Sequence, residues 1–409
     1  MSKNEAKLTI IVPTRERADT LIHTLKTLVI QEYANLEILI SDNFSQDDTA
    51  QVVKSFSDPR IKYVNTGKRL SMSDNWEYAL EKATGDYVTF MGDDDAFLPG
   101  SVAKAMPIIS AENTDAFVWQ KVEYCWPDYI DEGMRNWFSI KKFDTSLLKI
   151  KSRSALKRVM KFRESYAALP CLYNSIVRLS KIQEIKELSS TKKFFNAISP
   201  DIYSGIVLSK IVDEYVYSKF PFSINGASRH SNGTSLVRQS GSEKNTPSEK
   251  FKSENTLVFD DKVQMAPSVV VCVMGEYLFA EKILENIPFA KIDWKLYVNA
   301  VIRSAKTSFF PDKILESARH TNEHLRLDQK VPESLPPADS ESFRRGYYEE
   351  AFNFVVPGDQ VKNVFDAAKL VEGMLPQCDL IVEKSPLKLF LKRLYSFLIV
   401  ELKTLYRSL

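Results

Sequence analysis

The sequence predicts an α/β fold in which a Rossmann-like, mostly parallel sheet is covered by helices and followed by a helical C-terminal region. Short apolar, β-prone runs alternate with segments of helical period through the first hundred residues, and the connections between them are short. Such alternation is typical of parallel sheets with right-handed crossovers. At 409 residues the chain is long enough for two or three domains.

The first strand and the first helix are predicted close to the N-terminus. The run LTIIV from Leu8 to Val12 is apolar, rich in β-branched residues and followed by Pro13, as expected of a buried parallel strand. From Asp19 onward, apolar residues recur at helical spacing, which predicts a helix with one buried stripe. That stripe consists of Leu21, Ile22, Leu25, Leu28 and Val29.

Three more strands are predicted before residue 92. LEILIS leads to Asp42, IKYV forms the third strand, and YVTFM is followed directly by an acidic run. Ser45 with Asp48 three residues later predicts a capping box at the start of a helix that continues to Phe56. The buried face of the next helix, which Gly85 ends, is marked by Trp76, Ala79, Leu80 and Ala83.

Beyond residue 115 the pattern becomes more helical. Ala116 to Trp126 predicts one more aromatic-rich strand, and CLYNSIVRL contains another. Ala351 to Val356 and Val361 to Met374 are predicted as helical. The polar stretch SGSEKNTPSEKFKSEN lacks an apolar period and predicts a linker or an exposed loop. We therefore predict a domain over residues 1–238, with a donor half at about 7–115 and an acceptor half at about 116–238, a linker over 239–265, and a mainly helical region over 266–409.

Composition and charge restrict the class of protein. A formal net charge of +2 and ordinary hydrophobic content describe a globular chain and indicate no nucleic-acid partner. The four cysteines make no CxxC pair, so neither a zinc knuckle nor a disulfide framework is expected. The N-terminal apolar run is too short for a signal peptide, and charged residues interrupt every apolar run before it could span a membrane. These patterns predict a cytoplasmic protein.

The last helix allows two interpretations. After Pro386 the chain alternates apolar residues with Lys388, Lys392, Arg393, Lys403 and Arg407. Such a helix is expected either to dock on the rest of the protein or to lie on the anionic inner face of the cell membrane.

Three consecutive carboxylates, Asp93 to Asp95, need positive charge nearby. Acidic loops are explained by a helix N-terminus, by solvation or by a cation. This one follows a central strand, at the sheet edge where ligands of parallel sheets bind, and it is held between Gly92 and a Leu-Pro-Gly turn. Carboxylates without nearby His or Cys favour Mn²⁺ or Mg²⁺ shared with substrate phosphates. The first glycine of the chain is Gly67, so no glycine-rich loop follows the first strand, and phosphates must be held through the metal.

At this point a family resemblance becomes visible. IIVPTRERADTLIHTLKTLVIQ, EILISDNFSQDDT and GDYVTFMGDDDAFLPG resemble the three nucleotide-sugar segments of family 2 glycosyltransferases, which have the GT-A fold. The resemblance covers about Lys7 to Met106 and, more loosely, the chain to about Ser235. It implies metal-dependent transfer, with inversion, from a nucleotide-diphosphate sugar, most often UDP-linked, to a carbohydrate or lipid-linked glycan acceptor, as in surface polysaccharide assembly.

The resemblance also implies residue roles. The nucleotide-sugar site is expected at Pro13, Thr14, Arg15, Glu16, Asp42, Asn43 and Asp93. In it, Asp42 would accept a hydrogen bond from the base and Asp93 would face the ribose and diphosphate. The metal-binding group is expected at Asp94, Asp95 and His230, with Asp94 as the principal ligand of Mn²⁺ or Mg²⁺. Because Gly92 and Asp93 stand where many members carry an Asp-X pair, the division of roles among the three acids is left open.

The catalytic base implied by the resemblance is Asp201. It follows Ser199 and Pro200 at a predicted helix start, where family members place the acid that takes the acceptor proton. An acid at a helix start is also explained by the helix dipole. His230 in the loop SRHSNGTS would meet the metal or diphosphate, or else be an ordinary surface or capping residue.

Two functions other than glycosyl transfer are compatible with parts of this pattern. A catalytically degenerate domain could serve as a sugar-binding or partner-binding scaffold, but the retained acidic triplet argues against it. A sugar nucleotidyltransferase would need a glycine-rich basic loop after the first strand, and that loop is missing. A homo-oligomer is left open.

Overall fold

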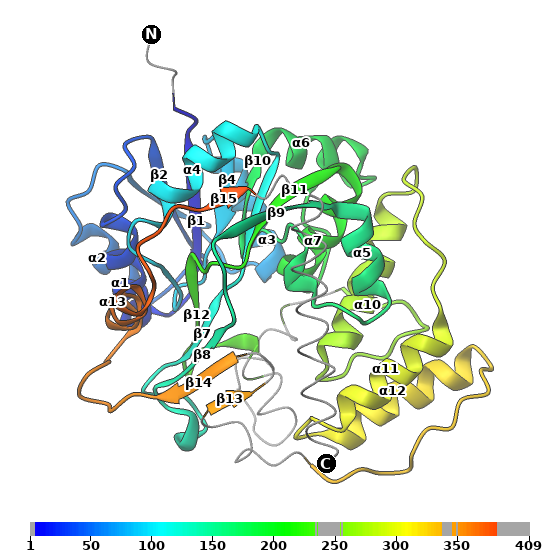
Figure 1. Ribbon diagram of the computed structural model, residues 1–409. Helices are drawn as coiled ribbons and strands as arrows, with labels where there is room; N and C mark the ends of the chain where they lie inside the picture. Colours follow the sequence, from blue (N-terminus) through cyan, green and yellow to red (C-terminus); the bar gives the residue numbers. More distant parts are fainter. Residues whose placement is uncertain are drawn as a thin grey trace.

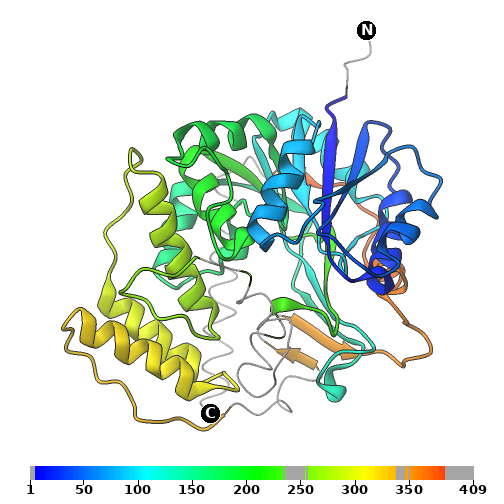
Figure 2. The same ribbon diagram turned by 180° about the vertical axis from the view of Figure 1, so that it is seen from behind.

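The computed structural model describes residues 5–233, 235, 254, 257–337, 346–348 and 351–382. A large sheet runs through the middle of the molecule, and helices lie on both of its faces (Figures 1 and 2). Alternate residues of the central strands belong to different hydrophobic clusters, with Ile10 and Val12 on one face and Ile11 and Leu39 on the other. This burial of both faces explains the nearly continuous apolar runs of the first strands.

Within the described residues the large sheet has nine strands. The first four strands in the chain, β1 to β4, are mutually parallel where they pair. The order across the sheet is β15 (Ile381–Val382), β9 (Ser146–Lys151), β11 (Glu214–Ser218), β6 (Ala116–Trp119), β10 (Ser175–Arg178), β4 (Tyr87–Phe90), β1 (Leu8–Thr14), β2 (Leu36–Asp42) and β3 (Ile61–Asn65). The predicted α/β fold with a mostly parallel central sheet is confirmed.

A second sheet continues from the carboxyl end of the first and is mostly antiparallel. Among the described residues its order is β13 (Gly346–Tyr348), β14 (Ala351–Val355), β8 (Trp137–Lys141), β7 (Val122–Cys125), β12 (Ser223–Ala227) and β5 (Ala96–Phe97). Because β5 comes directly after the acidic triplet, this sheet fixes one side of the predicted site.

The helices alternate with strands through the first ninety residues, and three described helices follow one another between residues 269 and 324. The described helices are α1 (Ala18–Val29), α2 (Thr49–Lys54), α3 (Met72–Lys82), α4 (Ser101–Glu112), α5 (Ser152–Met160), α6 (Leu179–Leu188), α7 (Pro200–Ile211), α10 (Val269–Ile283), α11 (Trp294–Ala305), α12 (Pro311–His324) and α13 (Val364–Met374), with short 3₁₀ turns η1 (Glu132–Met134) and η2 (Tyr166–Ala168). Figure 1 shows α11 and α12 side by side, away from the large sheet.

The chain after residue 345 returns to the first half of the molecule. β14 pairs with β8, β15 pairs in parallel with β9, and α13 lies against α1 (Figure 1). Val364, Ala367 and Val371 of α13 join the same hydrophobic cluster as Leu21 and Leu25 of α1. The C-terminal segment therefore completes both sheets and covers one helix of the N-terminal half.

Three local predictions were wrong. Residues 351–356, predicted as helical, contain strand β14, whose buried Ala351 and Asn353 flank the exposed Phe352, and pairing with β8 imposes this period of two. The capping box at Ser45 does not form, because α2 begins at Thr49 and the Ser45 hydroxyl instead accepts the Glu16 N–H.

The third error concerns residues 116–126, which were predicted as a single strand. They form β6 in the large sheet and β7 in the second sheet, joined by Gln120 and Lys121.

Some predictions lie outside the described residues. These are most of the linker assigned to residues 239–265 and the whole basic helix after Pro386. The domain boundaries assigned at residues 238 and 265 stay a prediction. Within the part of the chain that the structure describes, no helix combines the length and the apolar character needed to cross a membrane.

Candidate functional site

The segments that follow β1, β2 and β4 meet at one cavity of about 750 Å³. The turn after β1, the residue after β2 and the acidic loop after β4 all contribute to its wall, as expected for the carboxyl edge of a parallel sheet. Among the predicted site residues, those that line the cavity are Pro13, Thr14, Arg15, Glu16, Asn43, Asp93, Asp94, Asp201 and His230. Asp42 and Asp95 are buried and are not among the lining residues.

The Asp95 carboxylate accepts two main-chain hydrogen bonds, one from the acidic loop itself and one from β12. Its Oδ1 accepts the Gly226 N–H at 2.7 Å, and its Oδ2 accepts the Gly92 N–H at 3.1 Å. Burial raises the pKa of Asp95, although Lys121 and a hydrogen bond with Tyr173 act in the opposite direction. The carboxylate therefore holds the loop against β12. The place of Asp95 in the metal-binding group stays a prediction, since Asp95 does not line the cavity.

Two glycines make this close packing feasible. A Cβ on Gly226 would lie 1.8 Å from the Asp94 carbonyl oxygen, so only glycine lets β12 approach the acidic loop. A Cβ on Gly92 would lie 2.3 Å from the Tyr173 hydroxyl. The departure from the family pattern at residue 92 thus has a local cause: Tyr173 occupies the space that a side chain would need.

Asp94 lines the cavity, and its surroundings disfavour its charged form. Its Oδ2 accepts the Ser228 hydroxyl at 2.7 Å. Burial and the neighbouring Asp95 carboxylate raise the pKa of Asp94 to about 7, despite the attraction of Arg17. Deprotonating this buried acid therefore costs more free energy than it would in water, and any further cation would favour its charged form.

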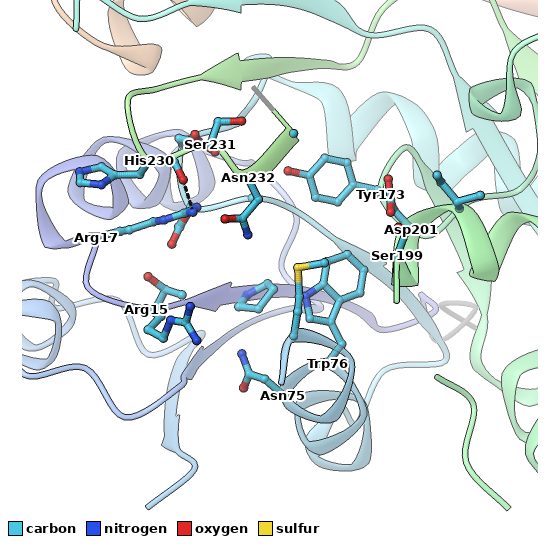
Figure 3. Close-up of a pocket in the computed structure, with 18 of the residues that line it drawn as sticks. Arg15, Arg17, Asn75, Trp76, Tyr173, Ser199, Asp201, His230, Ser231 and Asn232 are labelled. Carbon is cyan, nitrogen blue, oxygen red and sulfur yellow. Dashed lines mark hydrogen bonds and ion pairs between the residues drawn. The ribbon is translucent and has the colours of Figure 1, made fainter. Parts of the chain in front are cut away.

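Asp93 is paired with an arginine that the sequence analysis did not select. Arg17 donates to Asp93 Oδ1 at 2.8 Å and, with its other terminal nitrogen, to the His230 carbonyl oxygen, the contact drawn in Figure 3. Burial lowers the pKa of Arg17, but the Asp93 and Asp94 carboxylates outweigh it and raise that pKa above its usual range. The second oxygen of Asp93 is buried without a hydrogen-bond partner among the described residues.

These observations fit a divalent cation held by few protein ligands. Asp93 and Asp94 line the cavity, one of their oxygens lacks a partner among the described residues, and Arg17 forms an ion pair with Asp93. The described residues contain no cluster of three or more His, Cys, Asp or Glu side chains that could hold a metal by themselves. A cation here would need substrate oxygens or water to complete its shell, as Mg²⁺ usually does.

His230 lines the cavity, but its ring has other partners. Nε2 lies 3.2 Å from Asp19 Oδ2 and 3.0 Å from the Arg229 Nε. Figure 3 shows the imidazole pointing away from Trp76 and Asp201. Asp19 has its pKa lowered to about 2, chiefly by the hydrogen bond with His230. The metal role of His230 stays a prediction, and it requires the ring to leave Asp19.

Arg15 and Arg69 present two cations to the same side of the cavity. The Glu254 carboxylate lies between them, paired with Arg15 and 3.1 Å from the Arg69 Nε. Asn43 positions the Arg69 loop, since its amide exchanges two hydrogen bonds of 2.8 Å with the Leu70 main chain. The structure thus forms an anion-binding pair at the predicted nucleotide site.

Asp42 is buried beside Asn43 and does not itself line the cavity. Its Oδ1 accepts the Ser45 N–H at 2.9 Å, and its Oδ2 accepts the Asn65 side chain at 2.9 Å and the Tyr63 hydroxyl. Burial and Asp42 raise the pKa of Tyr63 to about 12. In this arrangement the carboxylate organises the loops after β2 and β3, and its proposed contact with a base stays a prediction.

Asp201 lies across the cavity from the arginines, as Figure 3 shows. It stands in the first turn of α7, where it was predicted, and its Oδ2 accepts the Tyr166 hydroxyl at 3.1 Å. Asp201, together with burial, raises the pKa of Tyr166 well above its usual value. The carboxylate therefore faces the cavity with one oxygen held by a neutral donor, which is suitable geometry for a base.

Sequence reasoning missed several residues between these two sides. Trp76 and Tyr173 stack with ring centroids 6.1 Å apart, and both line the cavity. Lys121 lies 4.7 Å above the Tyr173 ring and donates to Asn225 at 3.1 Å. Arg17 could have been noticed within PTRER, but Lys121 sits in the short connection between β6 and β7, which the single predicted strand concealed.

The comparisons with known proteins agree with this geometry. Residues 9–168 match the model of the family described as Glycosyl transferase family 2. A GalNAc(5)-diNAcBac-PP-undecaprenol β-1,3-glucosyltransferase of Campylobacter jejuni is 39% identical over 103 residues, which are 24% of this chain and 33% of that protein. The UDP-Glc:α-D-GlcNAc-diphosphoundecaprenol β-1,3-glucosyltransferase WfgD of Escherichia coli is 27% identical over 106 residues, covering 26% and 42%.

Among solved structures, residues 1–349 of Staphylococcus aureus TarS in complex with UDP-GlcNAc align with 78% of this chain and 89% of that one, at 13% identity and a TM-score of 0.45. The match to each of the two curated relatives spans less than half of its length. The GT-A assignment stays a prediction, whereas the α/β class with a mostly parallel central sheet is the one observed. Residues 9–168 are thus similar to glycosyl transferase family 2, over less than half of the chain.

Proposed function

We propose that the chain transfers a sugar from a UDP-linked donor to a lipid-linked or other carbohydrate acceptor, with inversion at the anomeric carbon. The observation that carries the proposal is that Asp93, Asp94 and Arg15 line the same cavity as Asp201, with Arg15 across from Asp201 (Figure 3). The names of the two relatives support a UDP-linked donor and a lipid-linked acceptor. One name contains UDP-Glc, and both contain an undecaprenol diphosphate carrier.

The proposed chemistry uses the two sides of the cavity differently. Asp201 takes the proton from the acceptor hydroxyl as that oxygen attacks the anomeric carbon, and the bond from this carbon to the donor diphosphate breaks. Asp93 and Asp94 would hold Mn²⁺ or Mg²⁺, which when bound supplies positive charge to the departing diphosphate. Arg15 and Arg69 bind anionic groups of the donor, and Trp76 with Tyr173 offers an aromatic wall for a sugar face.

A lipid-linked acceptor would bring the protein to a membrane surface. Contact through the basic helix after Pro386 stays a prediction. The scaffold alternative is disfavoured by the cavity, because its acids and arginines converge on one space.

The test is a panel of nucleotide sugars, with Mn²⁺ or Mg²⁺ and with diphosphate-lipid-linked acceptors, in which release of nucleoside diphosphate is measured. We expect turnover with a UDP-sugar, and a fall of about 100-fold or more in kcat for Asp94→Asn. A folded wild-type protein that neither binds nor turns over any donor would leave the scaffold as the better explanation.

A further inference from the structure

The start of α7 is held by a carboxylate from a distant part of the chain. Glu276 of α10 accepts the Ser199 N–H at 2.6 Å through its Oε1. Ser199 is the residue that precedes the first turn of α7, and its own side chain makes no capping hydrogen bond there. An acidic side chain from another helix thus does what a local capping residue ordinarily does.

Glu276 is an unusual residue for this position. Its side chain is fully buried, and its Oε2 has no hydrogen-bond partner among the described residues. Burial raises the pKa of Glu276 well above its usual value, although the Ser199 N–H opposes this. A buried carboxyl group with an unsatisfied oxygen lowers stability, and an apolar residue of similar size would pack there at less cost. Fold stability alone therefore does not explain it.

The residues that Glu276 holds belong to the wall of the functional site. Ile198 and Ser199 line the cavity, and Asp201 follows two residues later in the first helical turn. Around them, Cys272, Val273 and Tyr277 of α10 pack in the same hydrophobic cluster as residues of α7. The hydrogen bond from the Ser199 N–H to Glu276 fixes the position and orientation of the first turn of α7 within this packing. It therefore also fixes the direction in which the Asp201 side chain points.

We propose that Glu276 is a positioning residue for Asp201, through which α10 sets the geometry of proton removal from the acceptor. The inference rests on the proposed function, since it gives Asp201 the role of base. It assigns to the helical region after residue 266 a part in the reaction that the family match over residues 9–168 does not cover.

The experiment compares Glu276→Met, Glu276→Gln and the matched control Glu281→Gln, which changes an exposed acid on the same helix. For each we would measure the transfer kcat, the affinity for UDP by calorimetry, and the Tm. Glu276→Met removes the acceptor oxygen at nearly constant volume and should lower kcat by about 10- to 100-fold. UDP affinity should change less than twofold. Glu276→Gln keeps an acceptor oxygen and should restore kcat to within about threefold of wild type, and Glu281→Gln should match wild type.

A double-mutant cycle separates positioning from a general structural role. In an Asp201→Asn background, Glu276→Met should produce no further fall in kcat, because the group it positions is already gone. An equal fall in both backgrounds, an unchanged kcat in Glu276→Met, or a joint loss of UDP binding and kcat would overturn the inference. If Glu276→Met does not fold, a tenfold fall in kcat for folded Glu276→Gln would also overturn it. A wild-type protein that binds UDP but never transfers sugar overturns the proposed function first and the role of Glu276 with it.

Discussion

At the scale of single residues, the cavity is organised by pairs whose charges are not balanced within the pair. Arg17 contacts Asp93 but leaves Asp94 with a raised pKa, and Glu254 lies between two arginines. Such imbalance is typical of sites that complete their electrostatics with a ligand. A divalent cation would supply positive charge beside Asp94, and an anionic donor would supply negative charge to the two arginines around Glu254.

Glu254 gives the first prediction at this scale. Replacing it by glutamine removes the carboxylate that occupies Arg15 and Arg69, so both guanidinium groups become available to an anionic ligand. We expect Glu254→Gln to bind UDP about threefold more tightly, since partly exposed ion pairs are worth roughly 0.2–1 kcal/mol. Calorimetry at low and moderate salt measures the change.

The matched control is Glu164→Gln, which removes a carboxylate from Arg158 away from the cavity. It should leave the affinity for UDP unaltered. Weaker UDP binding by Glu254→Gln would mean that Glu254 assists the ligand.

Many residues of the site could be predicted from the sequence, because their polar side chains come directly after buried strands. Asp93 and Asp94 were selected because they follow a buried strand, Arg15 was implied by the family resemblance, and all three line one cavity. Lys121 and Tyr173 were not found, because a lysine in a turn and a tyrosine in an irregular segment carry no pattern of their own. Their roles arise only when distant segments meet.

At the scale of elements, the parallel strands are joined by a buried acid on β2. Glu37 is 1% exposed and accepts hydrogen bonds from Thr9 of β1 and from Thr84, while Lys7 and Lys62 pair with it. Burial raises the pKa of Glu37, but the hydrogen bonds from Lys62 and Thr84 outweigh it and lower that pKa from 4.5 to about 2. The charged form therefore stabilises the sheet.

This gives a prediction for the pH dependence of stability. A carboxyl group with a lowered pKa in the folded state contributes its stability above the unfolded value, and loses it as the pH falls. Glu37 should contribute roughly 2 kcal/mol near pH 7, allowing for the exposure of the two lysines, and this contribution should vanish between about pH 4.5 and 2.

Urea unfolding of wild type and Glu37→Gln across this range measures the difference. The variants should differ at pH 7 and converge near pH 2, whereas the exposed control Glu81→Gln should follow wild type throughout. A constant difference at all pH values would show that Glu37 acts through packing and not through its charge.

Element prediction failed where partners far along the chain decided the structure. Residues 351–355 contain Phe352, Phe354 and Val355, which favour a strand, and pairing with β8 sets the period of two. Likewise, the hydroxyl of Ser45 is used by the turn after β1 and is not available to cap α2. Local propensity could not reveal either partner.

At the scale of the whole molecule, the segment after residue 345 returns to the second sheet, where β14 pairs with β8. Phe354 of β14 stacks on Phe138 of β8 with ring centroids 5.1 Å apart, and Phe138 is fully buried. Phe354→Ala removes this cover and should lower the free energy of unfolding by about 2 kcal/mol. Thermal unfolding followed by fluorescence detects the fall in Tm.

The neighbouring Phe352 supplies the control, because it is on the same strand and 47% exposed. Phe352→Ala should lower the Tm by less than half as much. Equal effects of the two substitutions would mean that β14 contributes through its main chain alone.

The return of α13 to α1 also has a consequence for how the protein is made. Leu21 and Leu25 of α1 share their cluster with Val364 and Val371, and β9 gains its outer neighbour only at residues 381–382. During synthesis, the N-terminal half leaves the ribosome with part of this surface uncovered until residues 364–382 have been translated. Contacts of such long sequence separation form slowly. Exposed apolar surface of this kind favours aggregation of the nascent chain until α13 and β15 have been synthesised.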